Sequence, residues 1–227
     1  MRHPGTVRSA YSRSTTEATN GYLDDNLRPT EKRGGEFRFF IQAARQYGSP
    51  VLELASGAGR MLMVLAEAGF DVYGLETSRP MMQLAQRAIG HRREHSRIRL
   101  IRGDMFRFAF SRKFPLIIVP YSTFWFNCDL ATPKRCRHLG HETAHEACER
   151  KREPHMRRLA SQGLVCIVDA LLPGGAFIID DPIRDPDCAR QDERWWGNAG
   201  RRHGFTIAFG HPYRESSYCV MIARRRP

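Results

Sequence analysis

Apolar residues recur along the chain at two different spacings. Between Glu36 and Tyr47, Phe37, Phe40, Ile41 and Ala44 lie three or four positions apart, which predicts an amphipathic helix. Shorter apolar runs, bounded by glycine, proline or polar residues, predict strands. These runs are 51–55, 71–75, 98–101, 116–119, 176–179, 205–209 and 218–223, and further helices are predicted at 60–68 and from Pro80 to Ile89.

The order of these elements predicts the fold. Strands that alternate with helices form parallel βαβ units with helices on both faces of the sheet. The last two strands follow each other without a helix between them, so they can pair as an antiparallel hairpin at one edge. We therefore predict an α/β fold: a doubly wound, mostly parallel, seven-stranded Rossmann-like sheet with an antiparallel C-terminal hairpin. Residues 171–175 are expected to form a turn, and residues 181–204 connect the fifth and sixth strands.

Composition is typical of one globular domain. The chain has 227 residues, of which 41% are hydrophobic and 26% charged, and this excludes a disordered protein. We expect a flexible arm at residues 1–30 and a single domain at 31–227. No apolar run approaches the roughly 20 residues that cross a bilayer, and no secretory signal is apparent. Six cysteines are scattered without a CxxC pair, which predicts reduced thiols and a cytoplasmic location.

The net charge of +12 favours anionic partners, nucleic acid among them. The basic residues are mostly arginine, and they are dispersed in short clusters along the chain. No aromatic RNA-reading motif accompanies them. An arginine-rich genome would produce the same composition, so nucleic acid is a partner that the charge allows but does not favour.

A glycine turn lies between the first strand and the next helix, in the sequence Ala55-Ser56-Gly57-Ala58-Gly59. Such a turn lets a ligand approach the backbone closely, and the helix start presents unpaired N–H groups. Glu53, near the end of the first strand, suits an ammonium group or a bound water. Glu76 ends the second strand, where a carboxylate can accept both hydroxyls of a ribose but repels a 2′-phosphate. Together these residues predict a nucleoside site.

The stretch from Val51 to Ile89 resembles the first two motifs of class I S-adenosylmethionine-dependent methyltransferases, of the small-molecule, single-domain type. Arg102-Gly103-Asp104-Met105 is similar to the third motif of that family, and residues 114–121 resemble its fourth strand. Residues 172–180 resemble the turn into its fifth strand. The resemblance covers about residues 35–181 together with the terminal hairpin, and the motifs follow in the family's order.

The resemblance implies S-adenosyl-L-methionine as the cofactor and assigns residues to it. The glycine turn would hold the methionine part, Glu76 the ribose, and Asp104 the adenine amino group, while the next residue packs on the ring. The implied cofactor-binding residues are Glu53, Ala55, Gly57, Gly59, Glu76, Thr77, Met81, Asp104, Met105 and Pro120. Ala55 departs from the pattern because it stands where the family has its first glycine.

The methyl acceptor and a catalytic base are not identified by any motif. Tyr121 follows the fourth strand, where it could orient or deprotonate an acceptor together with Asn127 and Asp129. His211, between the last two strands, is a second candidate base, although a lone histidine is more often structural. Aromatic residues at Tyr121 and 124–126 either stabilise the cofactor's sulfonium charge or pack under a helix.

His141-Glu142-Thr143-Ala144-His145 matches the zinc-protease helix motif. The surrounding residues are highly polar, unlike an active-site helix, and a third protein ligand is not evident. We therefore assign no metal and interpret the segment as a solvated helix over the acceptor site.

The prediction is a cytoplasmic methyltransferase that acts on oxygen or nitrogen of a small-molecule acceptor, with no membrane association. Three alternatives stay open: an RNA methyltransferase, a catalytically inactive protein that binds S-adenosylmethionine, and a metallohydrolase. The sequence does not indicate the oligomeric state.

Overall fold

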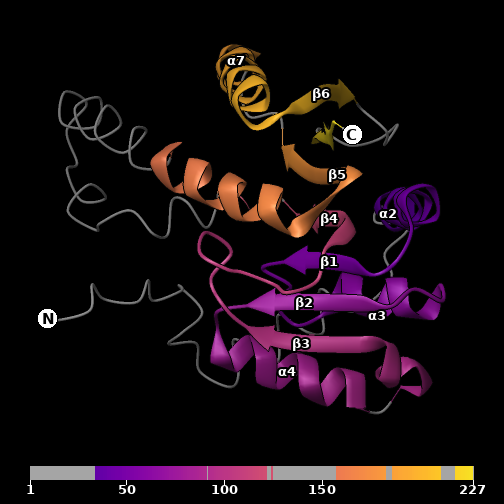
Figure 1. Cartoon of the computed structure of the whole chain (residues 1–227). Helices are drawn as coiled ribbons and strands as arrows, with labels where there is room; N and C mark the ends of the chain where they lie inside the picture. Colours follow the sequence, from indigo (N-terminus) through magenta and orange to yellow (C-terminus); the bar gives the residue numbers. More distant parts are fainter. Residues whose placement is uncertain are drawn as a thin grey trace, which may run out of the picture.

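The computed structural model describes residues 34–90, 92–121, 124, 157–182, 186–210 and 218–226. One seven-stranded sheet has the order β3-β2-β1-β4-β5-β7-β6, which Figure 1 shows from β3 at the bottom upward. Its strands are β1 (Val51–Leu54), β2 (Val72–Glu76), β3 (Ile98–Arg102), β4 (Phe114–Val119), β5 (Leu171–Pro182), β6 (Phe205–Gly210) and β7 (Tyr218–Arg225). Strands β1 to β5 are parallel, whereas β7 is antiparallel to both β5 and β6. The predicted fold class is confirmed.

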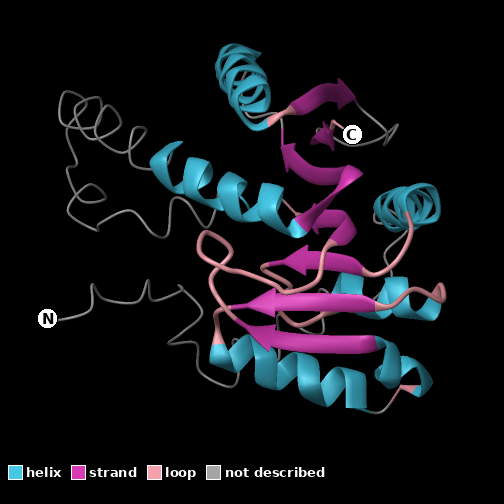
Figure 2. Cartoon of the chain, in the orientation of Figure 1, coloured by secondary structure: helices cyan, strands magenta, loops and turns pink. Residues whose placement is uncertain are grey.

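Helices flank this sheet (Figure 2). They are α2 (Gly34–Tyr47), α3 (Arg60–Glu67), α4 (Arg79–Gly90), the 3-10 helix η3 (Arg93–Arg97), a helix at residues 157–170, and α7 (Pro186–His203). The helix predicted from Glu36 ends as expected, since Gly48 has a φ of 100° and donates its N–H to the carbonyl of Ala44. Gly69, with a φ of 94°, follows α3 in the same manner.

Two hydrophobic cores lie on opposite faces of the sheet, because successive side chains of a strand point to opposite sides. On one face Val51, Leu116 and Ile118 pack with residues of α2 and α3. On the other face Leu52 and Leu54 pack with the helix at 157–170 and with α7. The sheet is therefore covered on both faces, and its strand ends are left to form sites.

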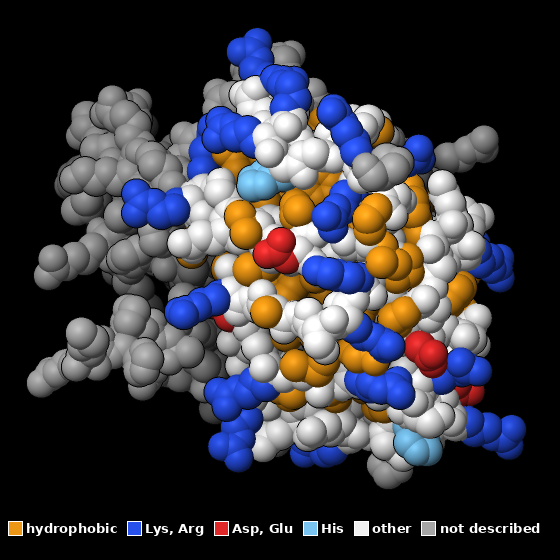
Figure 3. Space-filling view, viewed as in Figure 1, with side chains coloured by type: hydrophobic (Ala, Val, Ile, Leu, Met, Phe, Trp, Pro, Cys, Tyr) orange, Lys and Arg blue, Asp and Glu red, His pale blue; other side chains and the backbone are white. Residues whose placement is uncertain are grey.

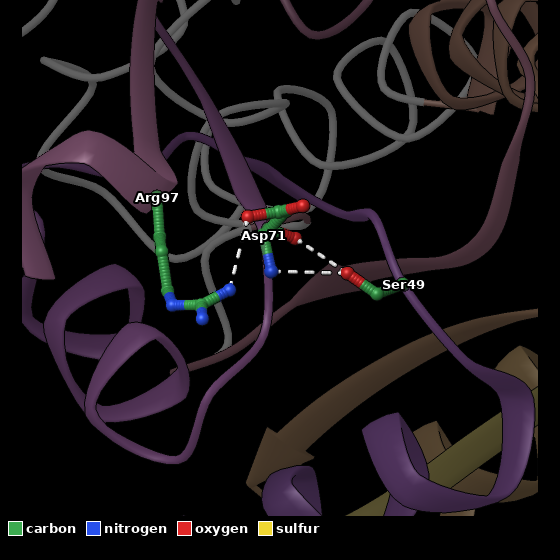
Figure 4. Close-up of polar contacts among 3 residues, drawn as sticks. All are labelled: Ser49, Asp71 and Arg97. Atoms are coloured by element: carbon green, nitrogen blue, oxygen red, sulfur yellow. Dashed lines mark hydrogen bonds and ion pairs between the residues drawn. The ribbon is translucent and has the colours of Figure 1, made fainter.

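Polar contacts join the starts of β1, β2 and β3 (Figure 4). Asp71 donates its backbone N–H to the Ser49 hydroxyl at 3.0 Å, and this hydroxyl donates to the Asp71 carbonyl at 3.2 Å. Arg97 donates to the Asp71 carboxylate at 3.4 Å. These contacts bind together the edge of the sheet at which the parallel strands begin.

One expectation for the second half of the chain was wrong. Residues 171–175, predicted as a turn, form the start of β5, where Leu171 already pairs with Phe114. The glycine at 174, with a φ of 77°, accompanies a register shift that lets the strand continue through this stretch. The segment 181–204, for which no helix was predicted, contains the helix α7, whose Trp196 is buried in the core.

No helix in the described parts of the chain is long and apolar enough to cross a membrane. Residues 1–30, predicted as a flexible arm, lie outside the described residues, and the assignment of 31–227 to one domain stays a prediction.

Candidate functional site

The turn after β1 contains three residues in left-handed backbone conformation. The φ angles are 56° at Ala55, 55° at Gly57 and 82° at Gly59. Such a conformation costs alanine about 1–2 kcal/mol, whereas glycine adopts it freely. Ser56 donates its N–H to the Leu75 carbonyl at 3.1 Å, and Gly59 donates to the Ser56 carbonyl at 2.9 Å. These bonds fix the glycine turn against β2.

The turn is closely packed on one side and open on the other. A Cβ atom added to Gly74 of β2 would lie 2.5 Å from Leu62 Cδ1 and 2.7 Å from Ser56 Oγ. A Cβ atom added to Gly57 would meet no atom within 4 Å. The absence of a side chain at Gly74 therefore lets the turn lie on β2, while space beside Gly57 stays accessible to a ligand.

Glu76 lies directly against this turn. Its Oε2 atom accepts the Gly57 N–H at 2.8 Å, and its Oε1 atom accepts the Ser78 N–H at 2.7 Å. The side chain is 7% exposed. Burial raises the pKa of Glu76, and the hydrogen bonds from Ser78, Gly57 and Thr77 act against this rise. Glu76, which comes 17 positions after Gly59 in the sequence, is thus in direct contact with the glycine turn.

Two buried polar atoms beside the turn, Glu53 Oε2 and Ser56 Oγ, have no hydrogen-bond partner among the described residues. Glu53 is 3% exposed, and burial raises its pKa well above the usual value, while nearby Arg60 lowers it and Glu76 raises it. Because buried polar atoms are nearly always bonded in folded proteins, atoms of this kind indicate that a ligand belongs there.

The third predicted motif lies beside the second. Gly103 donates its N–H to the Glu76 carbonyl at 3.0 Å, and Asp104 Oδ1 accepts the Phe106 N–H at 2.9 Å. Four other predicted residues belong to this edge. Three are buried (Met81, Met105 and Pro120), and Thr77 is partly exposed. The carboxyl ends of β1, β2 and β3 thus bring the predicted site residues together at one edge of the sheet.

Residues 51–139 match a family model described as a methyltransferase domain. This stretch contains the glycine turn, Glu76, Asp104 and the end of β4. Over this stretch the chain matches a methyltransferase domain. The prediction of an S-adenosylmethionine-dependent methyltransferase is thereby confirmed, and with it the cofactor. A comparison with curated proteins finds no match.

Solved structures show the same fold at low sequence identity. The CcbJ methyltransferase from Streptomyces caelestis matches with a TM-score of 0.65 at 14% identity, over 97% of this chain and 99% of that chain. The glycopeptide N-methyltransferase MtfA complexed with S-adenosyl-L-methionine matches with a TM-score of 0.59 at 16% identity, over 85% and 93%. An amino pentose methyltransferase from Micromonospora echinaspora, bound to the same cofactor, gives 0.58 at 16% identity, over 99% and 100%.

Tyr121 is the candidate catalytic residue that the structure describes in the methyltransferase domain. Its φ is 67°, and the Arg60 guanidinium lies 3.6 Å from its ring centroid. Burial and the nearby Glu36 raise the pKa of the Tyr121 hydroxyl well above its ordinary value, although Arg60 acts in the opposite direction. The phenol is therefore protonated at neutral pH, and it can donate a hydrogen bond but is a poor base.

Sequence reasoning missed the charged residues around Tyr121. Glu36 comes from the first turn of α2, Arg60 from the start of α3, and Asp180, which is 2% exposed, from β5. All three contribute to the electrostatic environment of Tyr121. Asp180 follows the buried apolar residues 176–179 within β5, as Glu76 follows those of β2, and this pattern was the available signal. Nothing in the sequence links it to residues of α2.

Phe124 belongs to the core, which supports the packing interpretation for this member of the aromatic run. It is 1% exposed, and its ring lies 5.9 Å from that of Phe106 and 5.5 Å from that of Trp196. The other candidates of this region, Trp125, Phe126, Asn127 and Asp129, lie outside the described residues, as does His211.

The His141–His145 motif also lies outside the described residues. Within the part of the chain that is described, no group of three or more His, Cys, Asp or Glu residues is arranged to hold a metal ion.

Proposed function

We propose that this domain transfers the methyl group of S-adenosylmethionine to an oxygen or nitrogen atom of a small-molecule acceptor. The observation that supports this most is the hydrogen bond from Gly57 to Glu76, which sets a buried carboxylate against a turn that is open on one side. A nucleoside needs both features, since its sugar offers hydroxyl donors and its substituent needs close approach to the backbone.

The chain's own residues fit the cofactor. When bound, S-adenosylmethionine supplies a methyl group on a positively charged sulfur, so the protein mainly binds, orients and excludes water. Each oxygen of Glu76 accepts one backbone N–H, and a carboxylate oxygen can accept a second donor, here a ribose hydroxyl. The Glu53 oxygen that lacks a partner suits the ammonium of the methionine part.

The adenine would lie between the second and third motifs. Asp104 uses Oδ1 for the Phe106 N–H, and its second oxygen can accept from the adenine amino group. Met81 and Met105 are 3% and 5% exposed, and their thioethers suit the faces of an aromatic ring. Thr77 and Pro120 complete the proposed set at the ends of β2 and β4.

The acceptor would lie beyond Tyr121, at the end of β4. A protonated phenol can hold an acceptor by donating a hydrogen bond, and a neutral amine needs no strong base to attack a methyl group. The neighbour described as a glycopeptide N-methyltransferase supports nitrogen as one acceptor atom. The scattered cysteines further lead us to propose a cytoplasmic location.

Calorimetric titration with S-adenosylmethionine and with its demethylated product tests this proposal. We expect micromolar binding to the unmodified protein and a loss of roughly tenfold or more for Glu76→Gln, which keeps the side-chain shape but removes the charge. Glu94→Gln, on η3, is the matched control. If neither nucleoside binds more tightly than about millimolar, weaker than roughly −4 kcal/mol, the proposal is wrong.

A protein that binds the cofactor without transferring its methyl group is the alternative, because Ala55 departs from the family pattern. Incubation with cofactor labelled in the methyl group, together with a panel of small amines and phenols, separates the two. Label that stays with the cofactor despite micromolar binding would favour the alternative.

A further inference from the structure

Basic and aromatic side chains gather where the parallel strands begin, at the edge of the sheet opposite the glycine turn. They come from β2, β3, β7 and the segment that precedes β4. We define the basic aromatic surface by its members: Tyr73, Arg99, Phe110, Arg112, Lys113 and Arg225.

Tyr73 contacts two arginines of this surface. It pairs in register with Arg99 of the neighbouring strand, so both side chains leave the same face of the sheet. The guanidinium carbon of Arg99 lies 5.5 Å from the Tyr73 ring centroid, and that of Arg112 lies 5.2 Å away. Arg112 also donates a hydrogen bond to the Tyr73 hydroxyl. One ring thus lies beside two exposed cations.

Further rings continue from Tyr73. The Tyr73 and Phe114 centroids are 5.3 Å apart, those of Phe114 and Phe110 5.2 Å, and those of Phe110 and Phe108 5.8 Å. Phe114 is buried, whereas Tyr73, Phe110 and Phe108 are partly exposed. The helices α3, α4 and η3 contact β2 or β3 and pack with Ile98 and Leu100 on the other face of these strands. On its own face Tyr73 packs in part against the core that includes the helix at 157–170, so only part of its ring is exposed.

Two more cations lie at the end of the helix formed by residues 157–170. Lys113 donates to the Asp169 carbonyl, and Arg225 donates to the carbonyls of Val168, at 2.7 Å, and of Leu171. These bonds hold both side chains in place, and neither cation forms a salt bridge with a carboxylate within the described residues. Figure 3 shows Lys and Arg side chains among hydrophobic ones over the viewed face, with few carboxylates.

Neighbouring arginines are used differently. Arg97 forms an ion pair with Asp71, and Arg92 forms one with Glu67. The contacts of Arg99 and Arg112 described above are instead to an aromatic ring and its hydroxyl. Their positive charges therefore remain suited to an external anion.

We propose that the basic aromatic surface binds a single-stranded nucleic acid. Arginine forks match phosphate oxygens, and a base can stack on the exposed part of the Tyr73 ring or on a guanidinium plane. The net charge of +12 would attract a polyanion over a longer range. An acidic protein would pair with the arginines but would leave the rings unused. The sequence did not predict this surface, because residues 73, 99 and 112 become neighbours only through the sheet register.

Fluorescence anisotropy of a labelled uridine oligonucleotide, measured over a range of salt concentrations and without cofactor, tests the proposal. Arg99→Ala/Arg112→Ala should lower the affinity and reduce the slope of log K against log salt by about 1.4, for two lost phosphate contacts. Tyr73→Leu should lower the affinity roughly tenfold and leave the slope unchanged, because stacking is not ionic.

The control is Arg38→Ala/Arg87→Ala, which removes the same charge from exposed positions on α2 and α4. If this control weakens binding as much as Arg99→Ala/Arg112→Ala, only the overall charge matters and the proposal is overturned. Polyglutamate that displaces the oligonucleotide at equal charge concentration would overturn it in favour of an acidic protein. Absence of binding at low salt would overturn it as well, whether or not the protein binds S-adenosylmethionine. If Tyr73→Leu lowers the unfolding temperature, its weaker binding could come from partial unfolding. The comparison of Arg99→Ala/Arg112→Ala with the control then decides the proposal.

Discussion

The guanidinium of Arg60 lies over the ring of Tyr121, 3.6 Å from its centroid, and so joins the first residue of α3 to the segment that follows β4. This contact connects the glycine turn, which ends immediately before Arg60, with the proposed acceptor side of the site. Arg60 also lowers the pKa of the buried Glu53 carboxyl, against the larger effect of burial.

Replacing Arg60 with alanine should therefore destabilise the fold. The lost cation–π contact is worth about 0.5–2 kcal/mol, and Glu53 loses its nearby positive charge. A change of this size shifts the unfolding temperature of a chain of this length by roughly 2–4 °C per kcal/mol. Thermal unfolding followed by circular dichroism measures it, with Arg79→Ala, an exposed position at the start of α4, as the control. Equal unfolding temperatures for the two variants would show that the contact contributes nothing.

Ala55 has a φ of 56°, so glycine should be the better residue there. Ala55→Gly removes about 1–2 kcal/mol of left-handed strain, while the added freedom of the unfolded chain costs about 0.4–1 kcal/mol. We expect a net stabilisation of about 0.5–1 kcal/mol in urea unfolding. Ala58→Gly makes the same change three positions later, at a buried residue without a positive φ, and should destabilise. Destabilisation by both substitutions would contradict the strain argument.

The sequence predicted the fold well because strand and motif signals are local. Glu76 could be placed beside Gly57 from sequence alone, since parallel strands that are consecutive in the chain end at the same edge of the sheet. The glycine turn needed only the spacing of its own residues. In the glycine turn and in its contact with Glu76, the residues that meet come from the same element or from consecutive elements of the chain.

The missed features depend on contacts between distant segments. Glu36, Asp180 and Tyr121 come from three elements far apart in the chain, so no spacing rule brings them together. The helix α7 was overlooked because its charged residues outweigh the apolar ones, and Trp196 becomes a core residue only when packed against Phe124 and Phe177. The start of β5 was assigned to a turn because proline and glycine signals conceal its pairing with β4.

The buried Glu53 carboxyl should make stability depend on pH. Its pKa in the folded protein lies well above 4.5, mainly because of burial, so the folded state binds more protons than the unfolded state above about pH 4.5. The stability that the protonated group provides is therefore fully present below 4.5 and is lost as pH rises through the folded pKa.

In Glu53→Gln the side chain at position 53 no longer titrates. The free energy of unfolding of this variant should therefore rise relative to that of the parent protein as pH rises. Urea unfolding at about pH 4 and about pH 8 measures this difference directly. Glu76 titrates in the same direction and is present in both proteins, so the comparison removes the part of its titration that does not depend on Glu53. The same substitution at Glu94 is the control for the chemical change. If the free energy of unfolding of Glu53→Gln instead falls relative to that of the parent protein as pH rises, Glu53 is ionised in the folded protein and stabilises it.

Gly74 should tolerate no side chain, and the consequence should reach the glycine turn. A Cβ atom there would lie 2.5 Å from Leu62 and 2.7 Å from the Ser56 hydroxyl, so α3 or the turn must move. We expect Gly74→Ala to destabilise by about 1–3 kcal/mol, as overpacking of a close-packed core does. Because the displaced Ser56 immediately precedes Gly57, binding of S-adenosylmethionine should also weaken.

Gly90→Ala is the matched control, since a Cβ atom at the end of α4 would meet nothing within 4 Å. That change should be neutral or stabilise by up to about 1 kcal/mol, because alanine favours the helix. Thermal unfolding and calorimetric titration on both variants separate the two effects. If Gly74→Ala lowers the unfolding temperature but leaves cofactor affinity as in Gly90→Ala, the strain is absorbed by Leu62 on α3. The turn would then be independent of its support on β2.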